Sequence, residues 1–245
     1  MSQHVLLNSV DHKDVKINLS RNAELGDNLW YSVTFPAEFR SIQAHYPIFF
    51  HKDPASGQFY AVSLFGFQQN ENLFLDQSGW NASYIPLTVR RQPFLIGQQT
   101  VHEDGVEQQQ RVIHIDMDNP RVNTSEGEAL FYEFGGNTPY LDEVGDMLEV
   151  IHQGLVDSQS FAEILIANEL LESFTLEVTL DDASQNQMLG FYTINEDKLA
   201  SLDDNVISQL HQQGYLQAIY MCLASHSNVR NLMDVKNAQL KAKGA

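Results

Sequence analysis

The residues with the clearest potential for metal chemistry lie in the segment IHIDMD. If this segment is a strand, His114, Asp116 and Asp118 project to one face, because side chains alternate along a strand. A histidine and a carboxylate in that arrangement supply two ligands of the facial triad that holds ferrous iron, and a distant histidine would complete it. His152 or His211 could be that third ligand. The sequence therefore offers His114, Asp116 and His152 as a candidate metal site, with the identity of any cofactor unknown.

A structural interpretation of the same segment is simpler, and we prefer it. Polar side chains that alternate with apolar ones are typical of a strand with one wet face. An oxygenase that uses 2-oxoglutarate would usually also place an arginine shortly after the second histidine. No arginine or lysine follows His152 before Lys198. The segment VHED, with His102 and Asp104, repeats the spacing in a loop-like setting and is a weaker candidate.

Three other residues could bind a ligand without a metal. Arg90 and Arg91 are adjacent cations in an acidic chain, and they could clamp a carboxylate or phosphate through bidentate hydrogen bonds. They could equally pair with Glu71 or Asp76 and order that loop, which is the interpretation we prefer. Trp80 could stack on a ligand, although such a residue more often packs beneath its own loop.

The charge of the chain limits the classes of partner. The 245 residues include 14 basic and 32 acidic ones, for a formal net charge of −18. This charge repels phosphate backbones and anionic lipid, so nucleic acid and membrane surfaces are disfavoured. The range Val122–Asp197 holds 16 of the acids and no lysine or arginine. A cation-binding surface or a docking face for a basic partner would explain this run, but a solvated helix face explains it more simply.

Known catalytic motifs do not decide whether the protein is an enzyme. The sequence has no GxGxxG after a strand, no GxxxxGK[ST], no HExxH, no GxSxG and no EF-hand loop. Catalytic residues therefore stay unassigned.

Three features bear on the location of the protein. The single cysteine, Cys222, lies in the apolar stretch YLQAIYMCLAS, where we expect a buried and inert thiol, which fits a reducing compartment. The first twenty residues have neither a basic n-region nor a sustained apolar h-region. No run approaches the ~18 apolar residues of a membrane span. We expect a soluble, cytoplasmic protein, with export to the cell surface by a non-classical route as the alternative.

Strand patterns dominate residues 1–120. The segments rich in aromatic and β-branched residues are NLWYSVTF, HYPIFF, QFYAVSLFGF, QPFLIGQ and QRVIHIDMD. Asp53, Pro54 and Gly57 suit a hairpin loop between the second and third of them. Both faces of QFYAVSLFGF are apolar, so we predict a core strand covered on both sides rather than a surface of exposed rings.

Helical patterns dominate the second half of the chain. Ser125 with Glu128 predicts the capping box of a short helix. Thr138 before Pro139 predicts the start of an amphipathic helix, for which Gly154 is a plausible end.

Further along, Ser160 with Glu163 predicts another helix start. The segments FTLEVTL and QMLGFYTI flank DDASQN and predict a β-hairpin over residues 174–194. Apolar residues from Leu199 to Leu210 recur at helical spacing, and Gly214 breaks that pattern before further helix.

These patterns predict the α+β fold class, with a single domain over residues 1–245. A sheet-rich half, residues 1–120, would pack with helices and one β-hairpin from the helix-rich half, residues 121–245. The sequence is compatible with a homo-oligomer and leaves the oligomeric state open.

The order of several segments resembles the bacterial SapC family. In the first half these are HYPIFF, DPASGQFYAVSLFGF, NENLFLD and GWNASYIPLTVRRQPFLIG. In the second half they are IDMDNPRVNTSEGEALF, TPYL, LESFTLEVTL, LGFYTINEDKL, HQQGYLQAIYMCLAS and NLMDVKN. The resemblance runs from about Val5 to Asn237. The family is named for a surface-layer-associated protein and is distinct from the membrane permease of the same name.

The resemblance implies a role without assigning residues to it. Members similar to this chain tend to be encoded near outer-membrane TonB-dependent receptors, flavin-dependent halogenases and cupin-like oxygenases. This context implies an accessory or binding protein that assists the uptake or modification of an external metabolite, with a protein partner or a small metabolite as its ligand. The alternatives are a metal-dependent enzyme with an unrecognised site and a surface-layer-associated structural protein.

Overall fold

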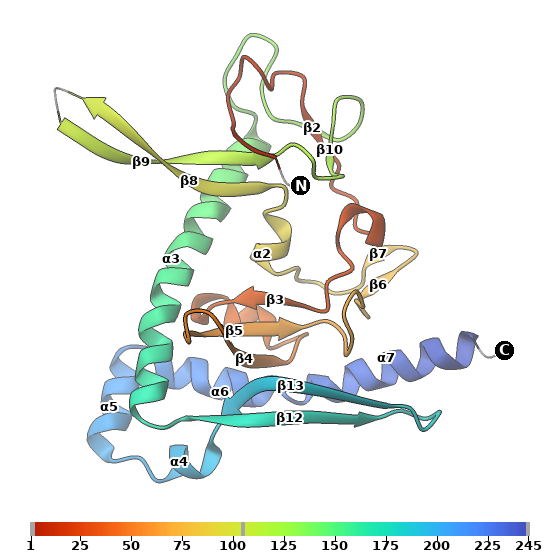
Figure 1. Cartoon of the computed structure of the whole chain (residues 1–245), viewed down its shortest axis with the longest axis vertical. Coiled ribbons are helices and arrows are strands. Elements are labelled where there is room, and N and C mark those ends of the chain that lie inside the picture. The colour runs from red at the N-terminus through yellow and green to blue at the C-terminus, as the bar shows by residue number, and fades with distance from the viewer. Residues whose placement is uncertain (1–2, 104–105, 244–245) are drawn as a thin grey trace. The chain divides into compact units, whose positions relative to one another are not determined.

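The computed structural model describes residues 3–103 and 106–243, and it contains helices and several antiparallel sheets (Figure 1). The predicted α+β class is confirmed. Contacts within the chain define two compact units: unit 1 comprises residues 1–27 and 87–153, and unit 2 comprises residues 28–86 and 154–245. The single domain over residues 1–245 stays a prediction. In the part of the chain that is described, no helix is both long enough and apolar enough to cross a membrane.

Unit 1 is built around short antiparallel sheets. The first has the order β1-β9-β8, with β1 at His4–Leu6, β8 at Phe94–Glu103 and β9 at Val106–Asp116. The second has the order β10-β2-β11, with β2 at Lys16–Ile17, β10 at Val122–Asn123 and β11 at Glu128–Ala129. The unit also contains the short helices η1 at Ala23–Leu25 and α2 at Leu87–Arg90.

The capping box predicted at Ser125 and Glu128 is wrong. Glu128 lies in β11 opposite Ile17 of β2, and the Ser125 amide donates to the side chain of Asn123 in a turn. Gly127 has a φ of +103°, and a Cβ there would lie 2.1 Å from the Ile17 carbonyl oxygen. This close approach of two backbones requires glycine and selects a strand over a helix.

Unit 2 is built around a five-stranded antiparallel sheet with the order β12-β13-β4-β5-β3 (Figure 1). Its strands are β3 at Tyr31–Thr34, β4 at Ile48–Lys52, β5 at Phe59–Leu64, β12 at Leu171–Thr179 and β13 at Gln185–Ile194. A separate strand pair is formed by β6 at Leu75–Asp76 and β7 at Gly79–Trp80. The helices of this unit are η2 at Pro36–Glu38, α1 at Phe39–Ile42, α4 at Glu196–Ala200, α5 at Asp204–Gln212, α6 at Tyr215–Ser225 and α7 at Asn228–Lys243.

The aromatic strand β5 is a core strand, as predicted. It lies between β4 and β3, and its side chains Ala61, Val62 and Leu64 are buried, which covers both faces. The loop before it is the predicted turn: Asp53 accepts hydrogen bonds from two following backbone amides, and Gly57 has a φ of +73°. The predicted hairpin is also confirmed, as β12 and β13.

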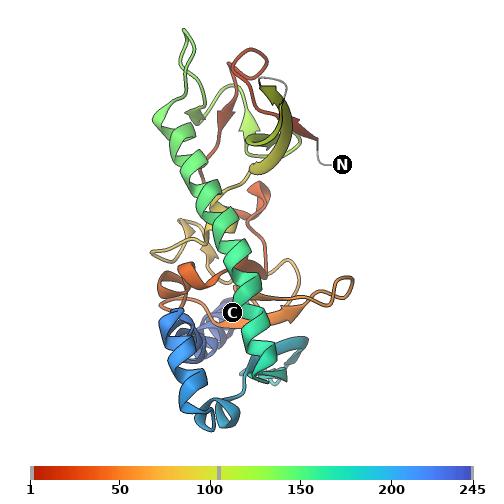
Figure 2. The ribbon, with the colours of Figure 1, turned by 90° about the vertical axis from the view of Figure 1, so that its left-hand side faces the viewer.

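Helix α3, at Pro139–Ala167, is one continuous helix of 29 residues (Figure 2). Thr138 caps it as predicted, because its hydroxyl accepts a hydrogen bond from the Leu141 amide at 3.3 Å. The predicted end at Gly154 and the predicted new start at Ser160 are wrong. A Cβ at Gly154 would lie 2.2 Å from the Phe35 ring, so this glycine admits a neighbouring ring rather than ending the helix.

The C-terminal helices are shorter than the apolar pattern suggests. The pattern from Leu199 to Leu210 is divided between α4 and α5. Gly214 takes a φ of +75° between α5 and α6, which confirms the predicted break. Cys222 in α6 is buried as predicted, and burial raises the pKa of its thiol, so the reactive thiolate is disfavoured.

Candidate functional site

The side chains of IHIDMD have structural partners within unit 1. The half-buried His114 packs against Gly97 of the neighbouring strand, where a Cβ would lie 2.6 Å from its Nε2. The Asp116 carboxylate accepts hydrogen bonds from the amides of Gln3 at 3.0 Å and Asp118 at 3.2 Å. Asp116 therefore fixes the local backbone at the end of β9.

The structure does not gather the proposed metal ligands into one cluster. His152 lies on α3 and His211 on α5. Among the side chains that the structure describes, those of residues 3–100 and 107–242, no three histidine, cysteine or acidic groups lie close enough to hold a metal ion. His102 and Asp104 of the VHED segment lie outside these described side chains.

The adjacent arginines differ in their surroundings. Arg90 is exposed at the end of α2, whereas Arg91 is half-buried and donates from Nη1 to the Phe94 carbonyl oxygen at 2.7 Å. Burial lowers the pKa of Arg91. The acids that we expected to pair with these arginines have other partners: Glu71 contacts Lys236, and Asp76 accepts hydrogen bonds from Ser78.

Trp80 packs within unit 2. Its indole nitrogen donates to the Tyr46 hydroxyl at 2.8 Å. Its ring meets Phe65 edge-on at 5.2 Å and stacks parallel to Phe74 at 6.4 Å between centroids. These contacts are those of a residue that packs beneath its own loop.

A buried ionic cluster in unit 1 had no signal in the sequence. Arg121 is only 1 % exposed, and its Nη2 donates to Asp27 at 2.6 Å, while Arg21 donates to the same carboxylate at 3.2 Å. Nη1 of Arg121 also donates to the carbonyl oxygens of Asn18 and Ser20. Burial and the neighbouring Arg121 lower the pKa of Arg21, and Asp27 opposes this effect. The cluster joins residues 18–27 to the segment before β10.

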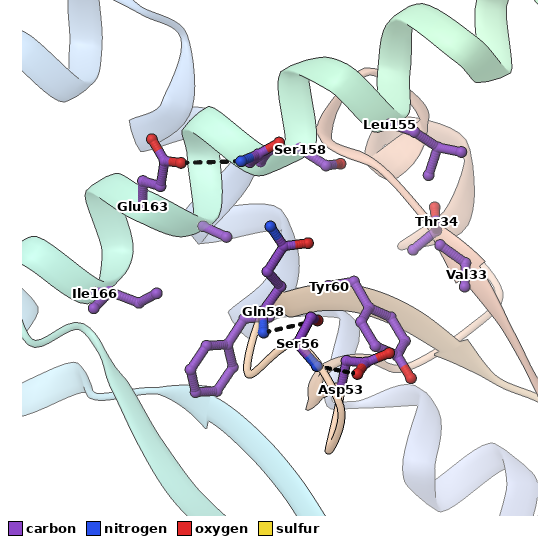
Figure 3. Close-up of a pocket in the computed structure, with 13 residues that line it drawn as sticks. Val33, Thr34, Asp53, Ser56, Gln58, Tyr60, Leu155, Ser158, Glu163 and Ile166 are labelled. Atoms are coloured by element: carbon purple, nitrogen blue, oxygen red, sulfur yellow. Dashed lines mark hydrogen bonds between the residues drawn. The ribbon is translucent and has the colours of Figure 1, made fainter.

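A pocket in unit 2 is the strongest candidate for a binding site. It has a volume of about 220 Å³ and lies between the second half of α3 and the β4–β5 hairpin, with β3 on one side (Figure 3). The register of β5 with β3 ends at Ala61 opposite Thr34, so Phe59 and Tyr60 extend past β3 and reach the pocket.

One face of α3 forms the helical wall of this pocket. The residues recur every three or four positions, the spacing that places side chains on one helix face. They are Leu155, Ser158, Gln159, Ala162, Glu163 and Ile166. Ser158 and Ala162 are buried in the wall, whereas the other four are exposed at its rim. The wall therefore combines apolar and polar side chains, and Ser158 is the buried polar residue among them.

Ser158 is the most informative residue of the pocket. It is 9 % exposed, and its hydroxyl oxygen has no hydrogen-bond partner among the described residues. A buried hydroxyl without a partner is costly, by roughly 1–3 kcal/mol. Thr34, also in the lining, donates a hydrogen bond from its hydroxyl to Glu38 at 2.8 Å and is completely buried.

Carboxylates supply the charge of the pocket lining. Asp53 accepts hydrogen bonds from the amides of Ala55 at 2.7 Å and Ser56 at 2.8 Å, and these bonds hold its pKa below the usual value. Glu163 accepts a hydrogen bond from Gln159 at 3.3 Å on the rim. Both side chains are acidic, and one cation, Lys52, lies just outside the lining with its Nζ 5.3 Å from the centroid of the Phe59 ring.

A second hollow in unit 2 is wider, at about 500 Å³, but no described buried side-chain atom in its lining lacks a hydrogen-bond partner. Phe49 stacks on Phe174 at 5.2 Å and on His226 at 4.8 Å between centroids. The Asn195 side chain at its edge donates to Glu172 and accepts from an amide of α4. Without an unpartnered buried group, this hollow gives a weaker indication of a ligand than the pocket beneath α3.

Comparison with known proteins gives one result. A model of the SapC family matches residues 7–232. No curated protein and no solved structure matches the chain.

Proposed function

The chain belongs to the SapC family, and on that premise we propose that it is an accessory binding protein. It holds a small metabolite in the pocket beneath α3. Together with a protein partner, it assists the uptake or modification of that compound, which is an external metabolite.

The unpartnered hydroxyl of Ser158 is the observation that carries this proposal. Buried polar groups in folded proteins nearly always have a hydrogen-bond partner, and an exception calls for an explanation. A ligand that bonds to Ser158 would remove the cost of burying this hydroxyl. The lining around it is largely apolar with a few polar groups, the composition typical of sites that orient a small molecule.

The exposed acidic residues of both units support the involvement of a protein partner. All sixteen acidic residues in the range Val122–Asp197 are exposed. Exposed charge of one sign steers association with a partner of the opposite sign, in a manner that weakens as salt is added. We expect a partner with a basic surface and a complex whose association slows at high ionic strength.

The proposal is tested by mass spectrometry of the protein purified from the organism that naturally produces it. Native and denaturing spectra are compared for the wild type, Ser158→Leu and Ser160→Ala. Leucine fills the pocket beside Ala162, whereas Ser160 is an exposed residue on the same helix and serves as the matched control.

We expect the wild type and Ser160→Ala to release extra mass on denaturation, and Ser158→Leu to release none. Circular dichroism checks that the leucine variant is folded. A bare subunit mass for the wild type, or the same bound mass in all three proteins, would contradict the proposal.

A further inference from the structure

We propose that the ligand of this pocket is a small organic amine, held through its protonated nitrogen by Asp53 and through its apolar body by α3 and Phe59. This inference rests on the proposed function and adds the chemical class of the ligand. Three properties of the lining lead to it: its charge, its hydrogen-bond acceptors and its size.

The charge of the lining favours a cation. Asp53 and Glu163 are its carboxylates, and no lysine, arginine or histidine is among the lining residues. Tyr60 is the remaining ionisable side chain, and burial raises its pKa, so it stays neutral at physiological pH. A carboxylate or phosphate ligand would meet two negative charges here, in a chain whose net charge is −18.

The polar groups of the lining are rich in acceptors. A carboxylate has about four lone-pair positions, so the two backbone amides that bind Asp53 leave capacity for a further donor. Thr34 donates a hydrogen bond to Glu38 and is completely buried, so the carboxylates of Asp53 and Glu163 are the acceptors that remain open to a charged donor. An ammonium group carries three donors and no acceptor, and it therefore matches this set.

Apolar and polar side chains are interspersed around the pocket. In Figure 3, Val33 and Leu155 lie on the same side as Thr34, and Ile166 lies on the same side as Glu163. Ala162 is buried in the α3 wall of the pocket. Phe59 reaches the pocket beyond the end of β3. The apolar side chains suit a ring or a short aliphatic chain.

The pocket volume limits the size of the apolar part of the ligand. At about 220 Å³, the pocket is smaller than the about 300 to 1,000 Å³ of sites that hold drug-sized ligands. A single ring with a short chain is the largest ligand that we expect the pocket to enclose.

The test uses three probes with the same ring and chain: 2-phenylethylamine, 2-phenylethanol and phenylacetate. Isothermal titration calorimetry measures their affinities for the full chain and for Asp53→Asn, Glu163→Gln and Glu143→Gln. Asparagine can still accept the two backbone bonds at position 53, so the turn is kept and the charge is removed. Glu143 is an exposed acid of α3 outside the pocket and is the control for charge alone.

We expect the amine to bind tightest and phenylacetate weakest. Asp53→Asn should weaken binding of the amine about fivefold, the upper end for a partly exposed ion pair, and leave 2-phenylethanol unchanged. Glu163→Gln should weaken the amine less, and Glu143→Gln should change none of the affinities. Ser158→Leu should abolish binding of the amine and the alcohol, which places them in the pocket.

Three results would overturn the inference. Phenylacetate could bind as tightly as the amine, Asp53→Asn could weaken the amine and the alcohol equally, or none of the probes could bind. The mass measurement on the host protein decides the proposed function separately, because a released ligand that is not an amine would overturn this inference and leave that function standing.

Discussion

The ionic cluster of unit 1 and the pocket of unit 2 bury polar groups for different ends. In the cluster, Arg121 and Arg21 share the carboxylate of Asp27, and two carbonyl oxygens accept from Nη1 of Arg121, whose Nε is left without a partner in the described residues. In the pocket, the hydroxyl of Ser158 is buried without any such partner in the described residues. The first arrangement is what a stable fold needs, and the second is what a ligand site needs.

The two regions show that a buried polar group can stabilise a fold or can mark a binding site. A buried charge that is paired within the chain holds segments together, and removing its counter-ion strongly destabilises them. A buried hydroxyl that the chain leaves unused lowers stability, and natural proteins retain such costs where function requires them. The two regions should therefore respond to mutation in opposite directions.

The largest effect is expected at the cluster. Asp27→Ala leaves Arg21 and Arg121 buried without their shared counter-ion, which should lower the free energy of unfolding by about 3–5 kcal/mol. Urea denaturation followed by circular dichroism measures the change. Asp118→Ala, at an exposed position of the same unit, is the control and should have little effect. A loss below about 1 kcal/mol for Asp27→Ala would show that the cluster does not hold the unit together.

The next effect compares two glycines of helix α3. Gly154→Ala would place a Cβ 2.2 Å from the Phe35 ring and should lower the free energy of unfolding by about 1–3 kcal/mol. At Gly145 the nearest atom is the Ile113 Cδ1 at 3.9 Å, so Gly145→Ala should raise it by up to about 1 kcal/mol through helix propensity. Thermal denaturation of both variants tests the pair. Equal changes would mean that Phe35 does not restrict position 154.

A pH-dependent effect is expected from Tyr140. Burial raises the pKa of Tyr140 to about 12, against about 10 for an exposed tyrosine. Between these values the unfolded chain loses the phenol proton and the folded chain keeps it. The stability from this group is therefore full below about pH 10 and is lost as the pH rises toward 12.

We expect Tyr140→Phe to make the free energy of unfolding fall less steeply with pH in this window. Phenylalanine keeps the ring beside Phe94 and removes the titrating group. Urea denaturation at several pH values between about 9 and 11 measures the slope. An unchanged slope would contradict the assignment of this proton to Tyr140.

The smallest effect on stability, and the only increase expected from removing a polar group, is at Ser158. Ser158→Ala removes a buried hydroxyl without a partner and should stabilise the ligand-free protein by about 1 kcal/mol, or about 2–4 °C in Tm. Differential scanning calorimetry after removal of any ligand measures this shift. Destabilisation by a similar amount would show that the hydroxyl serves the fold.

The parts of the fold that the sequence predicted are those with local causes. Each of three features depends on residues within a few positions. They are strand β5 with its two apolar faces, the turn at Asp53 and the cap at Thr138. The errors arose where a distant partner decides. Gly154 depends on Phe35, which lies far away in the sequence.

The candidate site could not be predicted from the sequence for the same reason. The predicted helix end at Gly154 and new start at Ser160 left Leu155 and Ser158 outside any helix, so the α3 wall was not predicted. The gap beside β3 on the opposite side also had no local signal. A serine within a helix carries no local sign that its hydroxyl lacks a partner. Asp53 was recognised as a turn residue, and its place in the pocket follows from the position of α3 within unit 2.

The most direct test of the account is a crystal structure of the protein purified from its own host. We predict density for a small molecule in the pocket beneath α3, with a polar atom within hydrogen-bond distance of the Ser158 hydroxyl. A pocket filled only by water, or a bound molecule elsewhere in the protein, would contradict the claim that this pocket is the binding site.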